Sequence, residues 1–109
     1  MSFISLDEFR KAEIKIGTVR SAEHVPDTDK LLRLEVDFGE GTIRQILSGI
    51  AAYIEPSVIV GRQFPFITNL EPRIIRGLVS NGMLLAVGEG DAFALLSPTR
   101  PVSAGTRIR

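Results

Sequence analysis

Residues 32–38 read Leu32-Arg33-Leu34-Glu35-Val36-Asp37-Phe38, the most regular alternation of apolar and polar side chains in the chain. Successive side chains of a β-strand point to opposite faces, so the apolar members share one face and the charged members the other. Gly39-Glu40-Gly41 follows directly and leads into a second extended run, residues 42–47. The segment therefore predicts a β-hairpin with one buried face.

Further short elements are predicted on both sides of this hairpin. Extended runs occur at residues 14–20, 61–68, 83–87 and 92–96, the last two joined by a turn at residues 88–91. Within these runs, Gly17 indicates a bulge or bend and Pro65 indicates an edge strand. Residues 5–12 predict a short helix, because Ser5 and Glu8 have the spacing of a capping box. Residues 49–54 predict a helical turn that ends before Pro56.

Five or six short strands must hide their edges, which favours a small closed or partly open barrel. We therefore expect an all-β, five-stranded OB-fold barrel with a short N-terminal helix and a C-terminal extension. An SH3-like barrel or a small sandwich is the alternative. A chain of 109 residues is long enough for one hydrophobic core, so residues 1–109 are expected to form a single domain.

Composition excludes several kinds of chemistry. The chain has no Cys and one His, His24, which leaves no disulfide, thiolate zinc site or His-rich metal site. Neither a nucleophile elbow nor a phosphate-binding glycine loop is found, so we expect a protein that is not an enzyme and needs no cofactor. The N-terminus lacks the pattern of a signal peptide, and no run approaches 18 apolar residues. A cytoplasmic protein without membrane contact is expected.

The formal net charge of zero conceals a gradient along the chain. Residues 1–40 carry six basic and nine acidic side chains, whereas residues 41–109 carry seven basic and four acidic ones. All basic residues of the second part are Arg, which suits bidentate contacts with phosphate. The distribution permits a phosphate-binding face on the second part of the chain.

Two segments could contribute to such a face. In residues 69–85, Arg73 and Arg76 lie in a loop opened by Pro72, where guanidinium and backbone N–H groups could face phosphates. The same loop could equally be a solvated connection whose arginines pair with Glu71. In residues 24–31, Lys30 could contact phosphate and His24 could stack on a base. Alternatively, the two aspartates of that loop only shape the turn.

Taken together, the two segments resemble the tRNA-binding domain family, an OB-fold module also found at the C-terminus of many methionyl-tRNA synthetases. The resemblance runs nearly end to end. It is carried by Ile14-Lys15-Ile16-Gly17-Thr18-Val19, Asp29-Lys30-Leu31, Ser48-Gly49-Ile50-Ala51, Asn69-Leu70-Glu71-Pro72-Arg73, Arg76-Gly77, Ser80-Asn81-Gly82-Met83-Leu84-Leu85 and Leu96-Ser97-Pro98.

The resemblance implies a non-catalytic protein that binds folded tRNA by shape and phosphate contacts, with little sequence specificity. The tRNA-binding residues it implies, together with the neighbouring cations, are Lys30, Arg73, Arg76, Ser80, Asn81, Gly82 and Met83. Ser80 would donate to a phosphate or a 2′-hydroxyl, and Met83 would support the loop from below. Glu71 and Ile74 depart from relatives that are more basic there, so the patch is thin and the binding is expected to be salt-sensitive.

The family also implies a homodimer formed through the N- and C-terminal segments. Two alternatives are kept. A CsaA-like export chaperone would share the barrel and bind unfolded or precursor polypeptides, although that branch usually lacks the Asp-Lys-Leu and Ser-x-Gly-Met features. An accessory subunit would deliver tRNA to an aminoacyl-tRNA synthetase.

Overall fold

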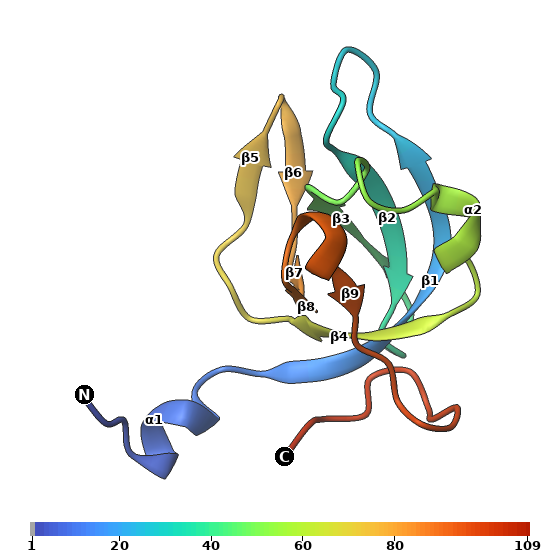
Figure 1. Cartoon of the computed structure of the whole chain (residues 1–109). Helices are drawn as coiled ribbons and strands as arrows, with labels where there is room; N and C mark the ends of the chain where they lie inside the picture. Colours follow the sequence, from blue (N-terminus) through green and yellow to red (C-terminus); the bar gives the residue numbers. More distant parts are fainter. Residues whose placement is uncertain (1) are drawn as a thin grey trace.

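The computed structural model describes residues 2–109 and contains a five-stranded antiparallel sheet that curls into a nearly closed barrel (Figure 1). Its strands lie in the order β3-β2-β1-β4-β7. They span Ile43–Ser48, Leu32–Asp37, Ile14–His24, Gln63–Ile67 and Met83–Leu84, respectively. The barrel closes where the chain entering β7 meets β3, because the Asn81 N–H donates to Gln45 O at 2.8 Å. The expected all-β barrel is confirmed.

The hairpin of β2 and β3 forms as the alternation predicted. Leu32, Leu34 and Val36 are fully buried, and Phe38 continues the same buried face. They pack in one core with Val19, Ile46, Ile59, Phe64, Phe66 and Leu84. The ring of Phe38 meets that of Phe66 edge-on at 5.3 Å. A continuous apolar interior therefore supports every strand of the barrel.

β1 is long enough to pair with two neighbouring strands. Its first half, Ile14–Thr18, pairs with β4, and its second half, from Thr18 to His24, pairs with β2. The bulge expected at Gly17 lies instead between Val19 and Ser21, where the register shifts. Gly17 is needed for close packing, since a Cβ there would lie 2.5 Å from Val36 Cγ1 and 2.6 Å from Phe38 Cε1.

β4 is not the edge strand that Pro65 indicated, because it lies between β1 and β7. Pro65 has no N–H to donate, yet its carbonyl still accepts from the Leu85 N–H at 3.1 Å. The pairing with β7 covers only Phe66 and Ile67 and stops next to Pro65. Pro65 therefore lies where the β4–β7 ladder ends, so its missing N–H donor costs this ladder no hydrogen bond.

Three short pieces complete the fold. β5 (Arg73–Ile75) pairs with β6 (Leu78–Ser80), and β8 (Ala86–Val87) pairs with β9 (Ala94–Leu95) around a 3₁₀ turn, η1 (Gly90–Ala92). The predicted second hairpin is therefore split, with Met83 and Leu84 joining the barrel. α2 (Pro56–Ile59) begins at the proline that was expected to end a helical turn. Tyr53 is 44% exposed and stacks on Phe93.

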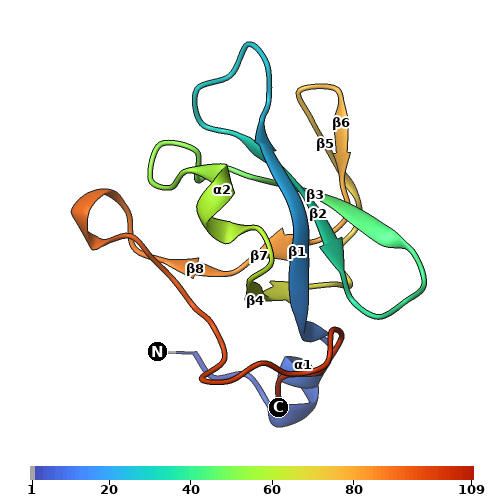
Figure 2. The same cartoon turned by 90° about the vertical axis from the view of Figure 1, so that its right-hand side faces the viewer.

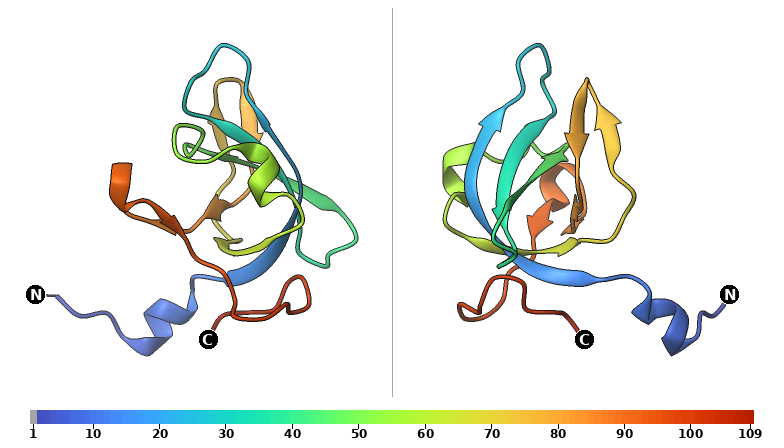
Figure 3. Two further views of the ribbon diagram at one scale, coloured as in Figure 1. Left: turned by 45° about the vertical axis from the view of Figure 1, so that its right-hand side comes forward. Right: turned by 180° about the vertical axis from the view of Figure 1, so that it is seen from behind.

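Both terminal segments lie at the lower end of the barrel (Figures 1 and 3). α1 (Leu6–Arg10) has the predicted capping box between Ser5 and Glu8. The C-terminal tail lies along the first half of β1: the Ile16 N–H donates to Thr106 O at 2.8 Å, and the Gly105 N–H donates to Ile16 O at 2.7 Å. The tail thus supplies hydrogen-bond partners for the backbone N–H and C=O of Ile16, in the part of β1 that β2 does not reach. Figure 2 shows it crossing beneath the barrel.

Candidate nucleic-acid interface

The segment expected to be a loop is a β-hairpin. Arg73 pairs with Ser80, Ile74 with Val79, and Ile75 with Leu78, so only two residues form the turn. These are Arg76 and Gly77, with φ values of +53° and +79°. Positive φ at both positions belongs to a type I′ turn, in which the first position favours Asn, Asp or Gly. Arg76 therefore occupies a backbone conformation that arginine seldom adopts.

The hairpin is fixed to β3 by polar contacts, of which those of Ser80 are buried. Ser80 is fully buried; its Oγ accepts the Leu47 N–H at 3.0 Å and donates to Gly82 O at 3.1 Å. Gln45 Nε2 donates to Val79 O at 2.9 Å. Because both hydrogen-bonding functions of the Ser80 hydroxyl are occupied inside the protein, a contact between Ser80 and a phosphate is not available in this arrangement. Ser80 positions the hairpin instead.

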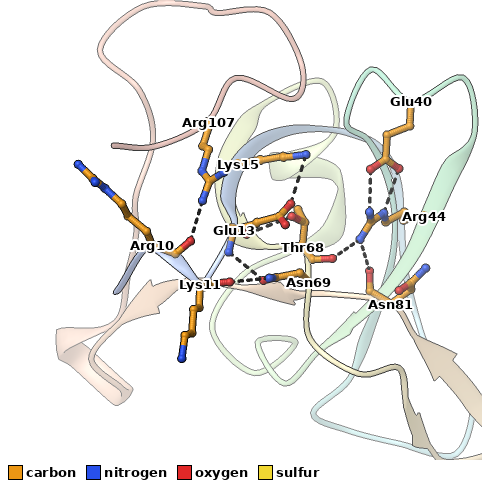
Figure 4. A network of polar contacts seen from close by, with 10 residues as sticks. All are labelled: Arg10, Lys11, Glu13, Lys15, Glu40, Arg44, Thr68, Asn69, Asn81 and Arg107. Atoms are coloured by element: carbon orange, nitrogen blue, oxygen red, sulfur yellow. Dashed lines mark hydrogen bonds and ion pairs between the residues drawn. The ribbon is translucent and has the colours of Figure 1, made fainter. Parts of the chain in front are cut away.

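Arg44 holds together the two ends of the segment that contains the hairpin (Figure 4). Its Nη1 donates to Thr68 O, ahead of β5, at 2.5 Å and to Asn81 O, after β6, at 3.5 Å. The Glu40 carboxylate accepts two further hydrogen bonds from this guanidinium, from Nε at 3.0 Å and from Nη2 at 2.7 Å. Nearby, Asn69 accepts the Glu13 N–H and donates to Lys11 O. The base of the hairpin is thereby tied to β3 and to the start of β1.

Gly82 and Met83 support this arrangement from the barrel side. Gly82 has φ +136° and is buried; a Cβ there would lie 3.0 Å from Ile46 Cδ1 and 3.2 Å from Ile67 O. Only glycine passes this close to the barrel without strain. Met83 is half-buried and pairs with Ile67 in the sheet. Both residues shape the turn that leads from the hairpin into β7.

Lys30 lies on the loop of residues 25–31 between β1 and β2. Val25 anchors one end of the loop in the protein interior, and Lys30 O accepts the Ala51 N–H at 3.0 Å. The turn itself depends on Thr28, whose hydroxyl donates to Val25 O at 2.8 Å, and on Asp27 at φ +63°. The side chain of Lys30 is exposed on a backbone held from both sides.

The loop and the hairpin project from the same end of the barrel, opposite the two termini (Figures 1 and 3). The structure thus divides the predicted site residues into two groups. Lys30, Arg73, Arg76 and Asn81 are exposed. Ser80, Gly82 and Met83 are buried or half-buried beneath them. His24 is exposed at the end of β1, where the loop begins.

Two other cations of the barrel, Arg33 and Lys15, are already paired with carboxylates. Arg33 binds Glu23 through Nε at 2.8 Å and through Nη2, and it reaches Gln45 at 3.2 Å. The hydrogen bond to Glu23 raises the pKa of Arg33 above its ordinary value. Lys15 lies beside Glu13 at the lower end. Unpaired positive charge at the upper end therefore comes from Lys30, Arg73 and Arg76, none of which forms an ion pair within residues 2–109.

Such a surface suits phosphates, because an ammonium and two guanidinium forks can contact a nucleic-acid backbone without reading its bases. Across residues 2–109, no group of three His, Asp or Glu side chains could hold a metal ion. Nor does that part of the chain contain a helix long and apolar enough to cross a membrane.

The sequence does not predict the supporting roles of Arg44, Gln45 and Asn69. The backbone groups that they bind lie 24 to 58 positions away, and each residue resembles ordinary strand or loop polarity. No local pattern could have identified them.

Comparison with known proteins agrees with this geometry. The chain matches the putative tRNA-binding domain over residues 14–107. It is 52% identical to the methionine–tRNA ligase of Methanoregula boonei over 106 residues, which are 97% of this chain and 16% of that protein. It therefore spans about one sixth of the length of that relative.

Two solved structures share the fold over nearly the whole chain. A MetRS-related protein from Pyrococcus horikoshii has a TM-score of 0.93 and 37% identity, with both chains fully covered. The chaperone CsaA from Bacillus anthracis has a TM-score of 0.87 and 30% identity, covering 99% of this chain and 100% of its own. The family resemblance expected from the motifs is confirmed: the chain belongs to the tRNA-binding domain family.

Proposed function

We propose that this chain is a non-catalytic protein that binds folded tRNA by shape and phosphate contacts, with little dependence on sequence. Lys30, Arg73 and Arg76 would contact phosphates, and Asn81 would add an exposed amide beside them. Ser80, Gly82 and Met83 would act through the shape of the hairpin rather than through contact. Residues 1–109 would act as one domain in the cytoplasm.

The observation that carries this proposal is Arg76. A long cationic side chain stands at the tip of a two-residue turn, at φ +53°, where asparagine or glycine would be less strained. The strain gives the fold no visible benefit, because Arg76 has no ion pair among the described residues. Its position places a guanidinium group at the most projecting point of the hairpin, where it can meet a phosphate.

The arrangement of the two elements supports shape recognition. The backbones of the hairpin and of the 25–31 loop are each fixed by hydrogen bonds, so the points from which their cationic side chains extend are held at a set separation. A rigid pair of contacts fits a folded RNA whose phosphates are also at set positions, and it discriminates against a flexible strand. With about three to five phosphates neutralised, the affinity should fall steeply with salt.

We further propose a homodimer formed by the terminal segments. Phe3 is 87% exposed, and Ile4, Leu6, Phe9 and Ile108 are also exposed at the same end. A cavity of about 620 Å³ lies there between α1 and the C-terminal tail. Burying these apolar side chains against a second copy would remove them from water and place two tRNA-binding ends on one particle.

The test is a gel-shift titration with native tRNA, the same tRNA unfolded, and an RNA duplex, each at low and physiological salt. Arg76→Asn should weaken binding of folded tRNA about three- to tenfold while leaving the melting temperature unchanged or raised, since Asn suits the turn. Lys30→Ala should weaken binding to a similar degree. Lys11→Ala, which removes an exposed charge at the opposite end, is the matched control and should bind as the wild type does.

Equal affinity for folded and unfolded tRNA would contradict shape recognition, and wild-type binding by Arg76→Asn would remove the hairpin from the site. A polypeptide-binding role is the second candidate, favoured by the similarity to CsaA and by the exposed apolar side chains at the termini. Failure to bind any RNA, with capture of an unfolded polypeptide instead, would support it. Recovery of a synthetase with the protein would support the accessory-subunit role.

A further inference from the structure

A second positively charged site lies on the other side of the barrel from the β5–β6 hairpin. It is an open hollow of about 370 Å³ between the start of β4, the middle of β1 and the C-terminal tail. Its lining includes Thr18, Arg62, Gln63, Ser97, Thr99 and Arg100, and no carboxylate. In Figures 1 and 3 these segments lie on the β1 and α2 side, away from β5 and β6.

Hydrogen bonds between distant parts of the chain build this hollow. Gln63 Nε2 donates to Val102 O at 2.6 Å, and the Val102 N–H donates to Gln63 Oε1 at 3.0 Å. This reciprocal pair fixes the tail against β4 at the point where it forms one wall. Gln63 Nε2 also donates to Thr18 Oγ1 at 3.1 Å, so the Thr18 hydroxyl keeps its own hydrogen for another acceptor.

The backbone on the opposite wall is fixed as well. The Gly61 N–H donates to Val19 O at 2.8 Å, and the Val19 N–H donates to Arg62 O at 2.9 Å. The Arg62 guanidinium carbon lies 6.0 Å from the centre of the Phe64 ring. The hollow therefore exists before any ligand arrives, which lowers the entropic cost of binding.

The charges of the hollow are uncompensated. Neither Arg62 nor Arg100 takes part in an ion pair within residues 2–109. The carboxylate closest in the sheet is Asp37, whose Cα is paired with that of Thr18. Asp37 already accepts from the Gly39 N–H at 2.7 Å and from Arg20 at 3.1 Å, and these two bonds lower its pKa.

We propose that this hollow binds a phosphate group, held by Arg62 and Arg100 with hydroxyl donors from Ser97, Thr99 and Thr18. Guanidinium forks and hydroxyls are the donors that recognise phosphate oxygens. The ligand is either the backbone of an RNA or a small phosphate-bearing molecule, and the chemistry of recognition is the same for both. The site is separate from the hairpin and does not require the proposed function to hold.

The experiment follows amide chemical shifts of the full chain in a ¹H–¹⁵N spectrum during titration with inorganic phosphate and then pyrophosphate, at constant ionic strength. Saturable shifts are expected at Gly61, Arg62, Gln63, Thr99 and Arg100. The double variant Arg62→Gln/Arg100→Gln should weaken binding at least tenfold. Arg73→Gln/Arg76→Gln is the matched control, with two arginines removed from the hairpin, and should leave the shifts intact.

Arg62→Lys/Arg100→Lys guards against misfolding, because it keeps the charge and loses only the fork; it should retain weakened binding. Shifts spread over all basic residues, shifts that persist in Arg62→Gln/Arg100→Gln, or no shifts at all would overturn the proposal.

A second titration, with tRNA at several salt concentrations, identifies the source of the phosphate. If tRNA occupies the hollow, the double Gln variant should lower the slope of log affinity against log salt by about one to two. An unchanged slope, with phosphate binding lost, would assign the site to a small molecule. A failure of tRNA binding altogether would refute the proposed function while leaving the phosphate titration unaffected.

Discussion

Replacing Ser80 with alanine tests whether this residue contacts RNA or holds the hairpin in place. The side chain is fully buried, and its Oγ both accepts the Leu47 N–H and donates to Gly82 O. Ser80→Ala removes one oxygen and leaves a buried donor on β3 and a buried acceptor before β7 without these partners. Neither group can reach water without moving the hairpin away from the barrel.

The cost follows from these two groups. A buried polar group left without its partner costs about 1–3 kcal/mol, so the two together should destabilise the protein by about 2–6 kcal/mol. For a domain of this size, one kcal/mol corresponds to a shift in Tm of roughly 4 °C. The variant should therefore melt about 8–24 °C lower. Its affinity for tRNA should fall only moderately, about three- to tenfold, because the exposed cations are still present.

Differential scanning calorimetry measures the Tm and the gel-shift titration measures the affinity for tRNA, both on the same preparation. Ser57→Ala is the matched control, since Ser57 is exposed on α2 and should change neither. A Tm within about 1 °C of the wild type, combined with more than tenfold weaker tRNA binding, would refute the structural role and make Ser80 a contact residue.

Three further outcomes are expected. Gly17→Ala should lower the free energy of unfolding by about 1–3 kcal/mol in urea, because its Cβ would overlap Val36 and Phe38; Gly49→Ala, which meets nothing within 4 Å, is the control. The pKa of Asp37 is lower in the folded protein than in the unfolded chain, where it is about 4. Ionised Asp37 therefore stabilises the fold above that pH, and this stabilisation is lost as the pH falls below it. Asp37→Asn should make the decrease of Tm in acid smaller. Phe9→Asp should convert the proposed dimer to a monomer in sedimentation; a wild-type monomer would contradict that interface.

The sequence predicted best what depends on neighbouring residues. The alternation of residues 32–38 requires only the period of a strand, and the capping box requires only three positions, so both formed as expected. The exposure of Lys30, Arg73 and Arg76 also agrees with ordinary charge patterning.

Expectations failed where a distant partner determines the outcome. Pro65 indicated an edge by its missing donor, but β7 ends beside it, and only the three-dimensional pairing shows this. The sequence of the β5–β6 hairpin predicts a loop, because Arg76 stands at a turn position where Asn or Gly would have indicated a hairpin. The burial of Ser80 could not be seen in the sequence either, because its partner Leu47 lies 33 positions away.

The placement of the termini has a practical consequence for anyone who handles this protein. Both chain ends lie at the end of the barrel opposite the hairpin and the 25–31 loop (Figure 1). A tag, a fluorophore or a sensor chip attached at either end would hold the particle with its cationic end facing the solution. The same orientation would let a larger polypeptide carry this module as an appendage without blocking it.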